Sequence, residues 1–101
     1  MATLAELNTL INESAIADKV RSAVIIAAKN IAFEAVDTPN HTNRLKWSSQ
    51  AFSDPNGMAT KVARYVIAAK SSSTLAEILA LSDQEIRDNV DASINIFANG
   101  S

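Results

Sequence analysis

The sequence predicts an all-α protein, a compact bundle of five to six helices with a long central Ala-rich helix. Hydrophobic residues make up 48% of the chain, and Ala, which has the highest helix propensity, is prominent among them. Only two Gly and two Pro interrupt the chain, and no segment alternates apolar and polar residues over the length of a strand. The 101 residues suit a single domain over 1–101.

Two helices are expected in the first third of the chain. Residues 3–6 have the form of a capping box, which predicts a short helix over about 4–12. Residues 12–14 then offer a break and a new cap. After the break, apolar residues recur at three- and four-residue steps and predict the central helix over 15–36. Its stripe consists of Ile16, Val20, Ala23, Val24, Ala27, Ile31 and Ala35.

Three apolar residues of the central helix, Ile25, Ile26 and Phe33, lie off this stripe. A helix that is apolar on more than one side must be covered by several elements or by a neighbouring molecule. Ile26 and Phe33 are therefore candidates for a protein interface.

Residues 37–40 predict a helix stop and a restart, with Thr38 as the cap and Pro39 in the first helical position. A third helix would cover about 39–52, with Leu45, Ser49 and Phe52 directed inward. Asp54 and Pro55 repeat this pattern and predict a fourth helix that ends near residue 70. Its shared face would consist of Met58, Val62, Tyr65, Val66 and Ala69.

Two more capping boxes, at 74–77 and 82–85, open the last helices. They predict a short helix over 75–81 and a longer one over 83–98. The last helix has a regular inward stripe of Ile86, Val90, Ile94 and Phe97.

The composition argues against catalysis and against a metal site. The chain has no Cys, which excludes disulfides, thiolate metal sites and cysteine nucleophiles. Its one histidine, His41, cannot complete a zinc site alone. We expect no enzyme, no catalytic residues, no cofactor and no metal. His41 is expected instead to make a polar contact at a helix amino terminus or to fix the 37–40 loop.

The same reasoning predicts no membrane association. The longest strongly apolar stretch, 23–28, ends at Lys29 and is far shorter than the roughly 20 residues that a membrane span needs. The amino-terminal residues have neither the basic start nor the apolar run of a secretory signal.

Charge is unevenly distributed along the chain. Residues 19–70 carry eight of the nine Lys and Arg side chains, whereas residues 71–101 carry five acidic side chains and one basic one. One interpretation is neutralisation within the molecule. The other is attraction between the opposite ends of neighbouring subunits in a ring or stack.

Residues 74–92 imitate a helix-turn-helix motif, which would imply DNA binding. The second helix, however, carries Asp83, Glu85, Asp88 and Asp91 against Arg87 alone. DNA phosphates would repel such a helix. We therefore expect no sequence-specific nucleic acid, and a small DNA-binding protein is the weakest of the functional alternatives.

Trp47 lies on a different face of the third helix from Leu45 and Phe52, near Arg44. It either packs within the monomer or anchors a protein interface, where Trp and Arg are enriched. The candidate interface residues are Ile26, Phe33, Arg44, Trp47, Asp88 and Asp91.

Residues 37–47 (DTPNHTNRLKW) resemble a segment of small helical proteins encoded among the virion-assembly genes of tailed bacteriophages. As in those proteins, the segment follows an Ala-rich helix, here 15–36, and precedes an Asp-Pro turn, here 54–55. A closing acidic helix follows, here 83–97. The resemblance covers most of the chain.

The resemblance implies a non-catalytic virion structural protein, with a subunit of the head-to-tail connector, or adaptor, ring as the first choice. It further implies a homo-oligomeric ring, portal and tail components as partners, and a location in the virion and, during assembly, in the host cytoplasm. The alternative is a capsid-associated or head-completion helper protein.

Overall fold

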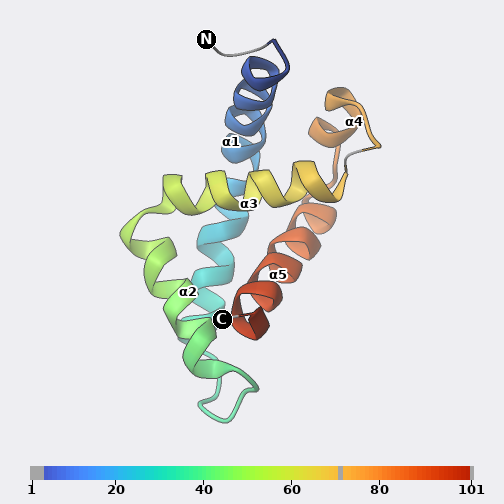
Figure 1. Ribbon diagram of the computed structural model, residues 1–101. Helices are drawn as coiled ribbons and strands as arrows, with labels where there is room; N and C mark the ends of the chain where they lie inside the picture. The colour runs from blue at the N-terminus through green and yellow to red at the C-terminus, as the bar shows by residue number, and fades with distance from the viewer. Residues whose placement is uncertain (1–3, 71, 101) are drawn as a thin grey trace.

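The computed structural model describes residues 4–70 and 72–100, which form five helices and no strand (Figure 1). The helices are α1 (Leu4–Ala32), α2 (His41–Ser53), α3 (Pro55–Ala69), α4 (Leu75–Leu79) and α5 (Asp83–Gly100). The predicted all-α class is confirmed. The molecule measures 46 × 30 × 21 Å along its principal axes.

The amino-terminal 29 residues of the described chain form one unbroken helix, α1. The predicted break at 12–14 is wrong, because no Gly or Pro interrupts the helical hydrogen bonds over this range. Glu13 is held within the helix, and its carboxylate accepts a hydrogen bond from Arg64 of α3 at 3.1 Å. Thr3, the expected cap of this helix, lies outside the described residues. The first turns of α1 extend beyond the other helices (Figure 1).

The other helices pack against the remainder of α1, and α3 makes the most extensive contact as it crosses α1 (Figure 1). Ala28 of α1 and Ala59 and Ala63 of α3 are completely buried. Small side chains at such positions let two helix axes approach closely. The buried core draws on all five helices, from Ile16 in α1 to Ile94 in α5.

The 33–40 segment differs from its prediction at both ends. α1 ends at Ala32, before the expected end of the central helix, and α2 begins at His41 instead of Pro39. Thr38 does not cap α2; its carbonyl accepts a hydrogen bond from the His41 amide at 3.0 Å. Asn40 occupies the N-cap position with a left-handed backbone (φ 60°) and makes no side-chain cap hydrogen bond.

The buried face of α2 is also different from the predicted one. Leu45, Ser49 and Phe52, which were expected to point inward, are exposed. The side chains that α2 buries are Trp47, Ser48 and Ala51. Two of these are small and allow α2 to lie close to α1, where the Ser48 hydroxyl donates to the Ala28 carbonyl at 2.8 Å. α2 therefore buries the large Trp47 ring together with two small residues, while Leu45 and Phe52 stay at the surface.

The caps of the last three helices follow the predictions. The Asp54 side chain accepts from the Gly57 amide at 3.0 Å, with Pro55 in the first turn of α3. Reciprocal side-chain and backbone bonds form the capping boxes of Thr74 with Glu77 and of Ser82 with Glu85. The predicted stripe of α5 is confirmed: three of its members are buried and Phe97 packs against the core.

Burial of Trp47 generates the first prediction. The Trp47 side chain is 2% exposed, whereas Phe52, an aromatic residue on the same helix, is 49% exposed. Trp47→Ala should lower the free energy of unfolding by about 3–5 kcal/mol because it leaves a cavity in the core. Phe52→Ala should change it by less than about 1 kcal/mol. Urea unfolding followed by circular dichroism compares the two, and equal effects would contradict the assignment of Trp47 to the core.

Candidate protein-interaction site

The loop between α1 and α2 is closed by a group of three polar side chains, Glu34, His41 and Arg44, called the clasp below. The Glu34 carboxylate accepts two hydrogen bonds from the Arg44 guanidinium, from Nε at 2.8 Å and from Nη2 at 3.0 Å. His41 Nδ1 lies 3.4 Å from Glu34 Oε1. A two-point contact between guanidinium and carboxylate fixes orientation as well as distance. The clasp therefore ties the start of the loop to the first turn of α2.

The electrostatics of the clasp favour its ionised form. The hydrogen bond from Arg44 lowers the pKa of the Glu34 carboxyl against the opposing effect of burial. The same hydrogen bond raises the pKa of the Arg44 guanidinium. Both side chains are largely shielded from solvent, with 17% of Glu34 and 24% of Arg44 exposed. Shielding of this degree makes the pair stronger than an ion pair on an open surface.

Further hydrogen bonds hold the loop and the start of α2 against α5. Within the loop, the Thr38 amide donates to the Ala35 carbonyl at 3.0 Å. The Asn40 amide group donates to the Asn99 side chain at 2.6 Å, and Asn43 donates to the Ala98 carbonyl at 2.9 Å. His41 also takes part in fixing this loop through its contact with Glu34, in agreement with the prediction from the sequence.

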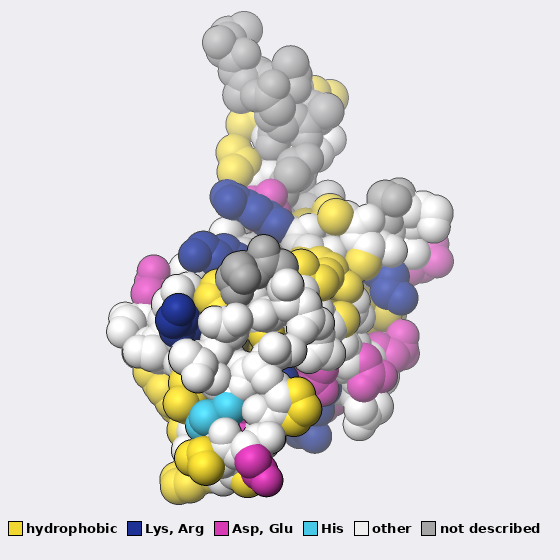
Figure 2. Space-filling view, turned by 60° about the horizontal axis from the view of Figure 1, so that its bottom comes forward, with side chains coloured by type: hydrophobic (Ala, Val, Ile, Leu, Met, Phe, Trp, Pro, Cys, Tyr) yellow, Lys and Arg dark blue, Asp and Glu magenta, His cyan; other side chains and the backbone are white. Residues whose placement is uncertain are grey.

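Two large apolar side chains of this fixed loop, Phe33 and Val36, point into solvent. Phe33 is 90% exposed and Val36 is 86% exposed. Figure 2 views the molecule from this end and shows hydrophobic side chains at the surface around the single histidine. We call Phe33 and Val36 the apolar tip. Two large apolar side chains close together in water form a small exposed patch, which is a candidate for contact with another protein.

A second exposed apolar surface lies on the first turns of α1. Leu4, Leu7, Leu10 and Ile11 are all exposed, and the first α1 residue in the core is Ile16. Their spacing of three, four and seven residues gathers them along one side of the helix. We call these four residues the α1 stripe.

Ile26 and Asp91, two of the predicted interface residues, lie together in a shallow groove between α1 and α5. Ile26 is 40% exposed there. Burial raises the pKa of the Asp91 carboxyl, and the charge of Arg44 partly offsets that rise. The groove is therefore electrostatically linked to the clasp through Arg44.

The remaining predicted residues have other positions. Trp47 is 2% exposed and belongs to the core, which favours packing within the monomer over a role as an exposed interface anchor. Arg44 is engaged by Glu34 within the clasp. Asp88 is exposed on α5 and accepts a hydrogen bond from Gln84 at 2.9 Å. Of the three apolar residues among the six, Phe33 is the most exposed, at 90%.

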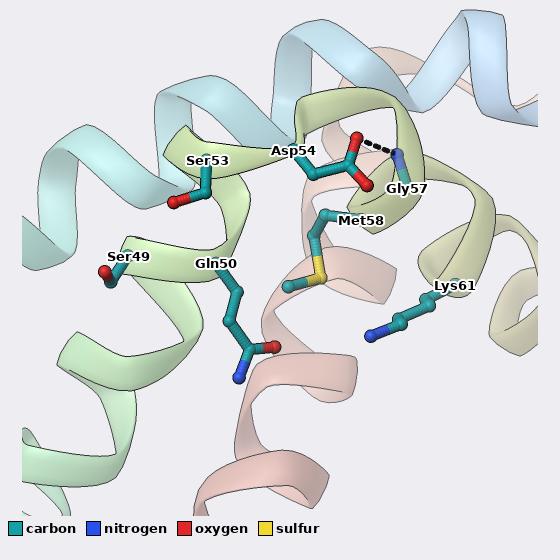
Figure 3. Close-up of a pocket in the computed structure, with 7 residues that line it drawn as sticks. All are labelled: Ser49, Gln50, Ser53, Asp54, Gly57, Met58 and Lys61. Carbon is teal, nitrogen blue, oxygen red and sulfur yellow. Dashed lines mark hydrogen bonds between the residues drawn. The ribbon is translucent and has the colours of Figure 1, made fainter.

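A third surface is a groove of about 270 Å³ between α2, α3 and α5. We call it the α2–α3–α5 groove. The residues that line it are Trp47, Gln50, Met58, Lys61, Ser93, Ile96 and Phe97. It continues into a more polar hollow at the α2–α3 corner, where Figure 3 shows Gln50, Met58 and Lys61 directed into the same space.

Sequence reasoning missed Glu34, Val36 and the α1 stripe. Glu34 gives no signal in the sequence, because its main partner, Arg44, lies ten residues away across an irregular loop. Val36 was placed at the end of the predicted central helix. The α1 stripe is visible as Leu4, Leu7 and Ile11 at helical spacing, but such a stripe is ordinarily buried within its own domain.

The described residues include the His, Asp, Glu and Ser side chains on which metal binding or catalysis would depend. Among them, no group of three or more His, Cys, Asp or Glu side chains could hold a metal ion. The pair of Glu34 and His41 resembles half of a nucleophile-activating arrangement. The Ser48 hydroxyl, however, is buried and donates to a backbone carbonyl instead of to His41. No helix in the described part of the chain has the length and apolar character to cross a membrane.

Comparison of the chain with protein-family models, with curated proteins and with solved structures gives no significant match. Function is therefore inferred from the residues of the chain itself.

The clasp generates a prediction that compares two acidic residues. Glu34→Gln should lower the free energy of unfolding at pH 7 by about 1–3 kcal/mol, because the charge of Arg44 loses its partner in a shielded position. Asp91→Asn should leave stability unchanged or raise it slightly, because burial disfavours the ionised Asp91 carboxyl. Thermal unfolding of both variants beside the unmodified protein provides the measurement. Equal destabilisation by the two substitutions would contradict the assigned roles.

The pH dependence of stability tests the same pair of bonds. The pKa of Glu34 is lower in the folded protein than its ordinary value of 4.5. The clasp therefore stabilises the folded protein fully at pH values above 4.5. This stabilisation is lost as the pH falls through the lowered pKa of Glu34 in the folded protein. Urea unfolding between pH 3 and pH 6 should show a smaller acid loss of stability for Glu34→Gln than for the unmodified protein. Identical pH profiles would count against the clasp.

Proposed function

We propose that this chain is a non-catalytic assembly protein of a tailed-bacteriophage virion, and specifically a subunit of the head-to-tail connector ring. The virion assignment rests on the resemblance of residues 37–47 to phage assembly proteins. One structural observation supports a role in protein contact: the clasp ties Glu34 to α2, while the neighbouring Phe33 and Val36 side chains stay in water. Binding through ordered side chains loses less conformational entropy than binding through a mobile loop. The apolar tip is thus prepared for contact with another protein.

The α1 stripe supports a role between two partners. A projecting amphipathic helix can lie in a hydrophobic groove of another protein, with anchors at positions i, i+3 and i+7. Leu4, Leu7 and Ile11 have this spacing and are exposed. The stripe and the tip lie near opposite ends of α1, so they can engage different proteins. A connector subunit needs two such surfaces, one toward the portal and one toward the tail.

The charge distribution also fits an assembling subunit. Among the described residues, no ion pair joins a basic side chain of 19–70 to an acidic side chain of 71–101. Arg64 pairs with Glu13, and Arg44 with Glu34. The acidic side chains of α5 are exposed at Asp83, Glu85 and Asp88. Their charge remains available for contacts between molecules.

The proposal places the chain in the virion and, during assembly, in the host cytoplasm. The direct test mixes the purified chain with the portal protein of the same virion and images the product by negative-stain electron microscopy. We expect ring-shaped density added to the portal, with the mass increase measured by native mass spectrometry. Binding to empty capsid shells without binding to the portal would contradict the connector role and favour a capsid-associated or head-completion helper.

The α1 stripe generates a prediction for this complex. Leu7→Glu combined with Leu10→Glu should weaken portal binding by more than about tenfold, because two apolar residues of the α1 stripe become charged. The melting temperature should stay nearly unchanged, since both side chains are exposed in the free protein. Leu45→Glu is the matched control, an exposed leucine on α2, and should bind normally. Normal portal binding by the double variant would exclude the stripe as the portal contact.

A further inference from the structure

We propose that copies of this chain associate head to tail, with the apolar tip of one copy inserted into the α2–α3–α5 groove of the next. The proposal deepens the connector function and rests on it for its biological context. Its physical basis is the match between these two surfaces in position, size and charge.

The two surfaces lie on different parts of the molecule. The loop that carries the tip forms one end of the structure, beyond the ends of α1 and α2 (Figure 1). The α2–α3–α5 groove lies where α2, α3 and α5 meet, with α1 behind them (Figure 1). One copy cannot close the contact on itself with its own tip fixed by the clasp. A contact between two different surfaces of identical chains is heterologous, and it yields a ring when the rotation between copies closes.

The size of the groove suits inserted side chains. The groove has a volume of about 270 Å³ and opens at one end into the more polar hollow of about 450 Å³. It is large enough for an aromatic side chain with a neighbouring aliphatic one. Met58 and Trp47 are buried beneath it, while Ile96 is 57% exposed at its side. The groove therefore presents apolar surface that Phe33 and Val36 can cover.

Charge complementarity selects a second copy as the occupant. Asp37 follows Val36 directly in the chain and is exposed beside the tip. Lys61 is exposed at the groove, and neither residue forms an ion pair with another described residue. Asp54 is the acidic residue that lines the adjoining hollow, and its carboxylate already accepts a hydrogen bond from the Gly57 amide as the cap of α3. Insertion of the tip brings Asp37 of one copy toward Lys61 of the next, which adds specificity to apolar contact.

The first test mixes two variants that each lack one surface. Phe33→Ala removes the tip, and Ile96→Glu places a charge in the groove; both side chains are exposed, so both variants should fold. Each variant alone should remain monomeric where the unmodified protein oligomerises in analytical ultracentrifugation. An equimolar mixture should give a dimer and stop there, because only one intact tip and one intact groove can meet. A mixture that remains monomeric would overturn the proposal.

The second test reverses the charges. Asp37→Lys and Lys61→Glu should each weaken self-association by about tenfold or more, and the double variant should recover most of the loss. Ile26→Ala is a matched control on the separate α1–α5 groove and should associate normally. Loss of association in Leu7→Glu with Leu10→Glu, together with normal association in Phe33→Ala, would overturn the proposal in favour of contact through the α1 stripe.

Failure of this inference is distinguishable from failure of the connector function. An unmodified chain that stays monomeric at high concentration and still binds the portal would refute the tip-and-groove contact alone. A chain that associates through the tip and groove but ignores portal and capsid would refute the connector function and leave the self-association intact.

Discussion

The length of α1 is the constraint on which the rest of the structure depends. Its 29 residues span about 43 Å at 1.5 Å per residue, nearly the full 46 Å of the molecule. The four shorter helices can cover only part of such a rod. They cover it from Ile16 to Ile31, the range over which α1 contributes residues to the core. Apolar residues are therefore left uncovered at the start of α1, in the α1 stripe, and in the loop that follows its end, in the apolar tip.

The two uncovered ends differ in a way that matters for function. The first turns of α1 carry their stripe on a regular helix, whereas the tip follows an irregular loop that needs its own stabilisation. That stabilisation comes from polar contacts: Glu34 with Arg44 and His41, and Asn43 with the Ala98 carbonyl. Polar groups thus hold the loop while its large apolar side chains stay outside. Within this short segment, Glu34 stabilises the fold, whereas Phe33 and Val36 are exposed. Substitution of Phe33 can therefore alter association without altering the fold.

Local sequence chemistry predicted the regular parts of this fold well. The caps at Asp54, Thr74 and Ser82 and the inward stripe of α5 all depend on neighbours within a few residues, which the sequence displays. The start of α2 and its buried face depend on distant contacts and were predicted wrongly. The predicted break in α1 at 12–14 is wrong for a local reason, because no Gly or Pro stands there. Phe33 was found as an apolar residue off the helical stripe. Glu34 could not be identified from the sequence, because its role depends on the contact with Arg44, which only the fold brings close.

The central claim is that the clasp-held tip is the surface through which the chain assembles. Hydroxyl-radical footprinting measures this most directly, because it reports the solvent accessibility of individual side chains in the dilute protein and in the assembled state. We expect strong protection of Phe33 on assembly, with Trp47 unreactive in both states because it is buried. Equal reactivity of Phe33 before and after assembly, with portal or with other copies of the chain, would contradict the central claim.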